Sequence, residues 1–224
     1  MSESVILGNS RLAKELRGFV ADVGGVPAVQ GAPVVVADAG VAGQKLLLEA
    51  EELAPEGTPI LATALLGSAA IAGKALRKPQ RLAIFGALPP VQAARVEWAR
   101  HPSMDGAQAA SVQAFLEALF GAADEVADAA CLVVARIVLS LIGEAVFMVS
   151  EQRVPSTDLD MAMRNGASYP YGLLWWADRI GPEEVVEGLR ALQKEYGEAR
   201  YRIAPWLLRR AAAGLPLGAP AGMA

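Results

Sequence analysis

The first half of the chain alternates between short apolar runs and stretches with the apolar spacing of a helix. The helical stretches are clearest at residues 11–20 and 43–53, and the apolar runs lie at 4–8, 33–39, 58–66 and 81–88. Strands that alternate with helices return to the same end of a sheet, so they pair in parallel and are covered by helices on both faces. The pattern predicts an α/β domain over residues 1–127.

The strand signal stops near residue 128, where the longest apolar segment begins. Residues 129–149 are almost numerous enough to cross a bilayer. However, Arg136, Ser140 and Glu144 are spaced to form one polar line along a helix, and charged groups at mid-bilayer cost several kcal/mol. The segment is therefore predicted to be a helix buried within the protein, and no membrane partner is expected.

Capping patterns mark further helices in the second half. Proline and acidic residues open the stretches, and glycine closes them, at 155–166, 181–197 and 204–214. These signals predict an all-helical domain over residues 128–214. The last ten residues, 215–224, have few side chains to pack and are predicted to form a flexible tail.

Composition excludes several classes of function. The chain has one histidine, His101, and one cysteine, Cys131, so no metal site built on these residue types is expected. The net charge of −4 gives no electrostatic reason to expect a nucleic-acid partner. The first ten residues lack the basic and apolar regions of an export signal, so the expected location is the cytoplasm.

The helical half resembles a known family. The stretch RIVLSLIGEAVFMVSEQRVPSTDLDMAMRNGASYPYGLLWWADRIG, residues 136–181, is similar to the C-terminal domain of 3-hydroxyacyl-CoA dehydrogenases. The resemblance implies an α/β plus all-α architecture, in which a shortened Rossmann-like domain precedes a helical dimerisation domain. It also implies a homodimer formed through the helical domain, with an acyl-CoA as the possible ligand.

The family's reaction moves a hydride between NAD and the 3-hydroxyl carbon of an acyl-CoA, and it uses a His–Glu pair, a Ser and an Asn. By resemblance, Glu97 holds the Glu position and Gly86 the His position. Ala64 stands at the Ser position, beside Thr63, which is the one polar group left there for substrate. Ala135 stands at the Asn position. The resemblance thus implies an active site that lacks three of its four groups.

The cofactor motif is also reduced. A dinucleotide-binding turn reads G-x-G-x-x-G, because the backbone must approach the pyrophosphate. Here the matching residues are Gly8, Ser10 and Ala13, and the stretch 23–33 contains no acid to hold the adenosine ribose. The expectation is a trimmed domain that binds no NAD, and NAD is the cofactor only if the family's activity persists.

Three functions remain open on these residues. The first is a family member without dehydrogenase activity, which acts as an acyl-CoA-binding or structural and regulatory dimer. The second is a working NAD-dependent dehydrogenase in which another group, such as His101, replaces the missing base. The third is a dimeric scaffold without a small-molecule ligand. The aromatic stretch that ends in Trp175 and Trp176 is predicted to form a helix-to-helix corner at the dimer core.

Overall fold

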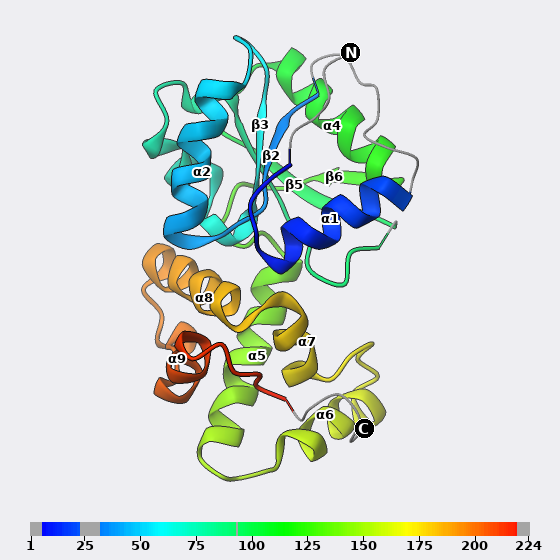
Figure 1. The fold of residues 1–224 in the computed structure, drawn as a ribbon, viewed down its shortest axis with the longest axis vertical. Helices are drawn as coiled ribbons and strands as arrows, with labels where there is room; N and C mark the ends of the chain where they lie inside the picture. The colour runs from blue at the N-terminus through cyan, green and yellow to red at the C-terminus, as the bar shows by residue number, and fades with distance from the viewer. Residues whose placement is uncertain (1–5, 23–31, 93, 219–224) are drawn as a thin grey trace.

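The computed structural model describes residues 6–22, 32–92 and 94–218. A sheet domain is stacked on a helical domain, and α5 runs from the sheet towards the far end of the helical domain (Figure 1). The six described strands lie side by side in chain order. Their bounds are β1 Ile6–Leu7, β2 Val34–Val36, β3 Ile60–Thr63, β4 Leu82–Phe85, β5 Val96–Arg100 and β6 Ala123–Glu125.

The sheet is parallel except at one pairing. Strands β1 to β4 pair in parallel, as predicted, and so do β5 and β6, but β4 and β5 are antiparallel. Only the loop 86–95 joins β4 to β5, whereas a parallel crossover needs about a dozen residues or more. The sequence pattern did not predict β5 and β6, because polar residues interrupt both of these short segments.

Helices cover both faces of the sheet. On one face α1 (Arg11–Asp22) and α4 (Gly106–Phe120) pack against alternate strand residues such as Val35, Leu61 and Phe85. On the other face α2 (Gly40–Leu53) packs against the intervening residues Val36 and Ala62. The short α3 (Ala69–Ala72) and the 3₁₀ turns η1 (Ala64–Leu66), η2 (Gly73–Ala75) and η3 (Pro79–Arg81) connect β3 to β4. The α/β prediction is confirmed.

The faces on which α1 and α2 lie indicate which strand order this sheet derives from. Both helices connect neighbouring parallel strands in the same direction across the sheet, yet they lie on opposite faces, so their crossovers have opposite hands. Crossovers are right-handed in nearly all proteins. In the strand order 3-2-1-4-5-6 the helix after the first strand leads to a strand on the far side of that strand. The face on which α1 lies is therefore the face expected in such a sheet if the strands on the far side of β1 were missing. Residues 23–31, where the sequence lacks the expected acid, lie outside the described residues.

The second domain is all-helical, as predicted. Its elements are α5 (Val134–Ser150), α6 (Ser156–Gly166), α7 (Leu173–Ile180), α8 (Pro182–Tyr196), the 3₁₀ turn η4 (Ala199–Tyr201) and α9 (Pro205–Ala212). The long helix begins at Val134 rather than at residue 129, because Cys131 and Leu132 have φ angles of 60° and 51°, which an α-helix cannot contain.

Helix α8 brings the two domains into close contact. A Cβ atom at Gly188 would lie 2.6 Å from Leu139 Cδ1 and 3.1 Å from Leu65 Cδ2, so a larger residue would force these side chains to move. The carboxyl ends of the parallel strands therefore face the helical domain directly.

The end of the described chain is packed. Leu217 is buried, and the N–H groups of Leu217 and Gly218 donate to the Asp178 carboxylate at 2.6 and 2.8 Å. These contacts contradict the predicted mobility for residues 215–218. The rest of the predicted tail, 219–224, lies outside the described residues.

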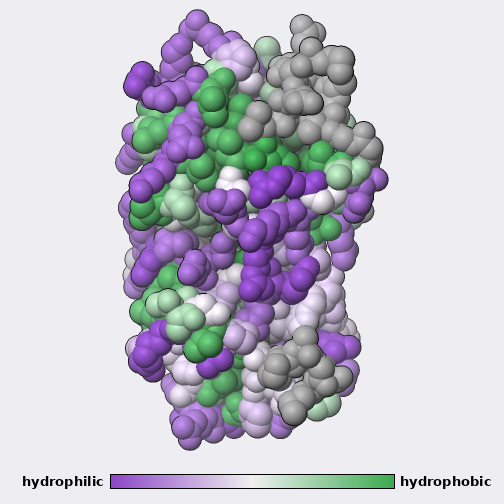
Figure 2. Space-filling view, viewed as in Figure 1, coloured by the Kyte–Doolittle hydropathy of each residue, from purple (hydrophilic) through white to green (hydrophobic). Residues whose placement is uncertain are grey.

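The surface is mixed in character. Hydrophilic residues gather over α1 on the face drawn in Figure 2, where Arg11, Lys14 and Arg17 are exposed. In the part of the chain that the structure describes, no helix is both long and apolar enough to cross a membrane.

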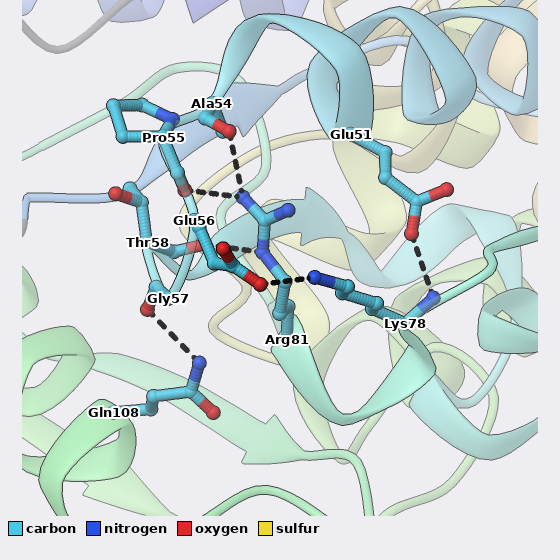
Figure 3. A network of polar contacts seen from close by, with 9 residues as sticks. All are labelled: Glu51, Ala54, Pro55, Glu56, Gly57, Thr58, Lys78, Arg81 and Gln108. Atoms are coloured by element: carbon cyan, nitrogen blue, oxygen red, sulfur yellow. Dashed lines mark hydrogen bonds and ion pairs between the residues drawn. The ribbon is translucent and has the colours of Figure 1, made fainter.

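A buried guanidinium holds the amino-end edge of the sheet together. Arg81, which is 4% exposed, donates from Nε to the Thr58 carbonyl at 2.8 Å, and from one terminal nitrogen to the carbonyls of Ala54 and Pro55 at 3.2 and 3.0 Å (Figure 3). Ala54 ends α2, so the cation lies at the negative end of that helix.

Candidate functional site

Three of the predicted site residues lie at the carboxyl ends of parallel strands, and Glu97 lies on the antiparallel strand β5. Gly8 follows β1, Thr63 ends β3 and Gly86 follows β4. Because the carboxyl ends of parallel strands meet at one edge, the fold brings these residues to the junction with the helical domain. Ligands of open α/β sheets bind at this edge.

Glu97 on β5 contacts the helical domain. Its carboxylate accepts hydrogen bonds from the N–H of Val133, at 3.1 Å to each oxygen, and from the N–H of Val134 at 2.7 Å. Burial raises the pKa of Glu97 above its ordinary value, and these backbone hydrogen bonds act in the opposite direction. The carboxylate therefore caps the first turn of α5.

Gly86 lies directly against Glu97. Its N–H donates to the Glu97 carbonyl at 2.9 Å, and a Cβ atom at Gly86 would lie 2.6 Å from Glu97 Cγ and 2.7 Å from Oε1. The family's His position is therefore beside Glu97 in space, as the resemblance implies, but the Glu97 side chain fills the volume that an imidazole would need. A histidine there would require Glu97 to move.

Apolar packing surrounds the remaining catalytic positions. Ala64 and Ala135 are each 1% exposed, and the Ala64 carbonyl accepts a hydrogen bond from the Cys131 N–H at 3.1 Å. Thr63 is equally buried, and its hydroxyl accepts from the Leu65 N–H at 3.4 Å. The Thr63 hydroxyl thus caps the turn η1 and is shielded from a ligand.

His101 lies at the opposite edge of the sheet from the Gly86–Glu97 pair. Its N–H donates to the Leu82 carbonyl at the start of β4, whereas Gly86 follows the end of β4. Four residues of strand separate His101 from Glu97, a span of about 13 Å. The imidazole Nδ1 accepts from the Ser103 N–H at 3.1 Å. The structure therefore excludes His101 as a relocated base for Glu97 in this conformation.

The turn after β1 has a complete internal set of hydrogen bonds. The Ser10 hydroxyl donates to the Ala37 carbonyl and accepts from the Ala13 N–H, both at 3.1 Å, so Ser10 is the N-cap of α1. Ala13 is fully buried. Both residues therefore have structural roles at the turn where a dinucleotide motif would hold its phosphates.

Asp38 is the residue at this site that the sequence motifs did not single out. Its carboxylate accepts from the Asn9 N–H at 2.9 Å and from the Ser10 N–H at 2.8 Å. Gly8, with φ +124°, allows this approach, because a Cβ there would lie 2.2 Å from Asp38 Oδ1. The available signal was its position, since an acid near the end of the predicted run at 33–39 lies at the ligand-binding edge.

Two cavities lie between the domains, and the larger has Asp38 in its lining. The larger, of about 510 Å³, is lined by Asn9 and Ser10 and by the acids Asp38, Glu183, Glu184 and Glu187. The other, of about 300 Å³, shares Glu187 and Arg190 with it and extends to the turn after β3. These residues do not fit NAD, because a carboxylate occupies the turn that should hold its phosphates and further acids surround it. Among the described residues no group of His, Cys, Asp and Glu is arranged to hold a metal ion.

Comparisons with known proteins agree with this architecture. Residues 132–222 match the family profile described as 3-hydroxyacyl-CoA dehydrogenase, C-terminal domain. The 3-hydroxyadipyl-CoA dehydrogenase of Escherichia coli (strain K12) is 37% identical over 87 residues, which are 39% of this chain and 18% of that protein. The probable 3-hydroxybutyryl-CoA dehydrogenase of Bacillus subtilis (strain 168) is 30% identical over 138 residues, 61% of this chain and 48% of that protein.

The chain thus contains a segment similar to the C-terminal domain of 3-hydroxyacyl-CoA dehydrogenases. It spans less than half the length of these two relatives. The crystal structure of (S)-3-hydroxybutyryl-CoA dehydrogenase from Ralstonia eutropha superimposes with a TM-score of 0.63 at 24% identity, and covers 80% of this chain and 65% of that one. This likeness supports the fold of a Rossmann-like domain followed by a helical domain.

Trp175 and Trp176 have different surroundings. Trp176 packs on the helical core, and its Nε1–H donates to the Pro89 carbonyl at 2.9 Å within the same chain. Trp175 is 43% exposed and stacks on Tyr171 with ring centroids 4.9 Å apart. The stretch forms the predicted corner between α6 and α7, and only Trp175 presents a large apolar surface to the outside.

Proposed function

We propose that this chain is a 3-hydroxyacyl-CoA dehydrogenase family member without dehydrogenase activity, and that it acts without NAD as an acyl-CoA-binding or structural and regulatory dimer. The proposal rests on the contacts that the Glu97 carboxylate makes within the protein. This carboxylate caps α5 and fills the space beside Gly86, so the pair that would accept a proton from a bound alcohol is missing.

The chemistry explains why this loss matters. Oxidation of a 3-hydroxyl group requires a base for its proton and hydrogen-bond donors that polarise the developing ketone. Loss of a general base alone removes about 10²–10⁴ in rate, and loss of preorganised donors removes about as much again. The methyl groups of Ala64 and Ala135, both buried, supply neither function.

Support for a dimer comes from the outer surface of the helical domain. Helix α6 has no buried residue, and neighbouring α5 exposes apolar side chains along one side. We call this surface the α5 strip, and its members are Val133, Val134, Ile137 and Met148. An apolar helix face without a partner in its own chain fits burial against a second copy.

Support for an acyl-CoA ligand comes from the cavity of about 300 Å³ between the domains. Its lining combines apolar walls at Leu65 and Ile71 with two cations, Arg190 and Lys194, and two acids, Glu187 and Glu195. Lys194 and the apolar walls suit a thioester with an anionic carrier, while Arg190 is paired with Glu187. The third possibility, a scaffold without a ligand, is the outcome if no acyl-CoA binds.

The direct test is a turnover assay. We expect no formation of NADH when the purified protein is mixed with NAD and 3-hydroxybutyryl-CoA or 3-hydroxyadipyl-CoA, under conditions in which the Bacillus subtilis relative serves as the reference. A rate within about a hundredfold of that reference would contradict the proposal, since loss of the base alone should cost at least that factor. Thermal shifts with the same acyl-CoAs then separate a ligand-binding protein from a scaffold.

Light scattering after size-exclusion chromatography tests the dimer. We expect Ile137→Glu in the α5 strip to yield monomers, because it would bury a charge in the interface. Leu53→Glu is the matched control, since Leu53 on α2 is also exposed, at 63%, but lies in the sheet domain. Dimers in both variants, or a monomeric unaltered protein, would contradict the assignment.

A further inference from the structure

We infer that the Asp38 carboxylate takes the place of a dinucleotide's diphosphate, so that the chain's own acid closes its phosphate site to NAD and to other diphosphates. The inference rests on the proposed function and extends it from the catalytic positions to the cofactor's end of the cleft. It concerns binding alone and involves no chemical step.

The geometry at the turn after β1 supports this reading. In a Rossmann-like domain the diphosphate accepts hydrogen bonds from backbone N–H groups at the start of the first helix. In this chain the N–H groups of Asn9 and Ser10 point to the two oxygens of Asp38, at 2.9 and 2.8 Å. One carboxylate therefore accepts from two backbone donors at the turn where a phosphate would bind, and helix α1, with twelve residues, supplies the same favourable dipole to it.

Gly8 shows that the turn is shaped for this contact. A side chain at Gly8 would overlap the Asp38 carboxylate, with a Cβ 2.2 Å from Oδ1. Glycine at this position usually lets the backbone approach a phosphate. Here the same absence of a side chain lets the carboxylate approach the backbone, so the remnant of the motif serves an internal anion.

Most charged residues that line the larger cavity are acids, whereas Arg11 and Lys14 line a further cavity at the Asn9–Ser10 turn. The cavity beside Asp38 is lined by Glu183, Glu184 and Glu187, and Arg190 is the one basic residue among its lining residues. Burial raises the pKa of Glu184, and the negative charges of Glu183 and Asp38 add to this effect. A bound diphosphate would meet the same repulsion from these carboxylates. Removal of Asp38 should therefore weaken the exclusion of diphosphates without abolishing it.

The absence of a described strand on the far side of β1 gives an independent reason why the site would not bind NAD. The adenosine half of a dinucleotide lies over the strands beyond the first strand of the classical order. In the described sheet β1 is the outermost strand, next to β2 alone. The described sheet therefore lacks the strands over which the adenosine half would lie, and Asp38 already bonds two backbone donors at the turn.

The test is a titration of the full-length, ¹⁵N-labelled protein with inorganic pyrophosphate, followed by NMR at the amides of Asn9 and Ser10. We expect these amide signals to stay in place in the unaltered protein. In Asp38→Ala they should shift and saturate, with an affinity at least about tenfold higher, because two donors at a helix N-terminus become free. Asp38→Asn, which keeps the side-chain volume, should show a smaller gain and replaces Asp38→Ala if that variant fails to fold.

Asp105→Ala is the matched control, because Asp105 caps α4 by accepting from the Gln108 N–H at 2.8 Å and lies far from the cleft in the chain. An equal gain in Asp105→Ala, no gain in either Asp38 variant, or saturable shifts of Asn9 and Ser10 in the unaltered protein would each overturn the inference. If the unaltered protein binds pyrophosphate there but turns over no substrate, the inference fails while the proposed loss of activity stands.

Discussion

The two edges of the sheet use the same physics with opposite charges. At the amino-end edge the Arg81 guanidinium donates to the carbonyls at the end of α2. At the carboxyl-end edge the carboxylates of Asp38 and Glu97 accept from N–H groups at the starts of α1 and α5. Each charge complements the helix dipole beside it and satisfies backbone groups that the helix leaves unpaired.

The two edges differ in the roles that charged side chains at these edges usually have in other α/β proteins. The amino-end edge commonly serves stability, whereas the carboxyl-end edge binds ligands. In this chain two acids of the carboxyl-end edge, Glu97 and Asp38, accept hydrogen bonds from backbone N–H groups of the protein itself. The comparison indicates that internal carboxylates can satisfy backbone donors at an edge where other α/β proteins bind ligands.

Loss of Arg81 should have the largest effect. Arg81→Met should lower the free energy of unfolding by about 3 kcal/mol, because it leaves three carbonyl acceptors near the end of α2 without their donor. Urea denaturation measures the change. Arg77→Met is the control on the same segment, where the side chain is exposed, and a change below about 0.5 kcal/mol is expected. Equal effects in both variants would contradict a special role for Arg81.

Loss of the Glu97 carboxylate should have an intermediate effect. Glu97→Ala should lower the free energy of unfolding by about 1–2 kcal/mol, the usual cost of losing an N-terminal cap, because the N–H groups of Val133 and Val134 lose their acceptor. Glu144→Ala, an exposed site further along α5, is the control. If Glu97→Ala leaves stability unchanged, the carboxylate does not cap α5 and the argument for its structural use fails.

Much of the fold could be predicted because its signals are local. The alternation at 33–66 and the capping residues of α8 predict elements from neighbouring residues alone. Strand β5 was not predicted, because Glu97 and Arg100 interrupt its apolar pattern and its stability comes from pairing with β4. That pairing is a tertiary effect and overrides local preference.

The candidate site was predictable only in part, for the same reason. The resemblance brought Gly86 and Glu97 into one site, and the structure shows them in contact. It could not show that Glu97 bonds α5 or that Asp38 bonds the turn after β1, because these contacts join residues 36–37 and 28–29 positions apart. A carboxylate in a sequence reveals its charge but not which backbone groups it will meet.

A small pH effect should distinguish Glu97 from an exposed acid. Burial raises its pKa in the folded state above the ordinary value of 4.5, so the folded protein binds this proton more tightly than the unfolded chain does. The contribution of this raised pKa to the free energy of unfolding is therefore fully present at low pH and is lost as the pH rises through the folded-state pKa. The stability of the unaltered protein relative to Glu97→Gln should increase as the pH falls from neutral towards 4.5. A flat difference, measured by urea denaturation across that range, would contradict the shift.

The smallest expected signal is chemical and concerns Cys131, at the junction that closes the carboxyl-end edge. The thiol is fully buried, and burial raises its pKa to about 12. Its Sγ lies 3.6 Å from the Gly188 carbonyl, where α8 is closely packed. Because the thiolate is the reactive form, iodoacetamide at mildly alkaline pH should leave the native protein unmodified and label it fully in urea. Mass spectrometry measures both, and the Gly188→Ala variant should become labelled in the native state as the close packing is forced apart. Rapid native labelling of the unaltered protein would instead show that this junction opens and that the close packing of α8 is not maintained in solution.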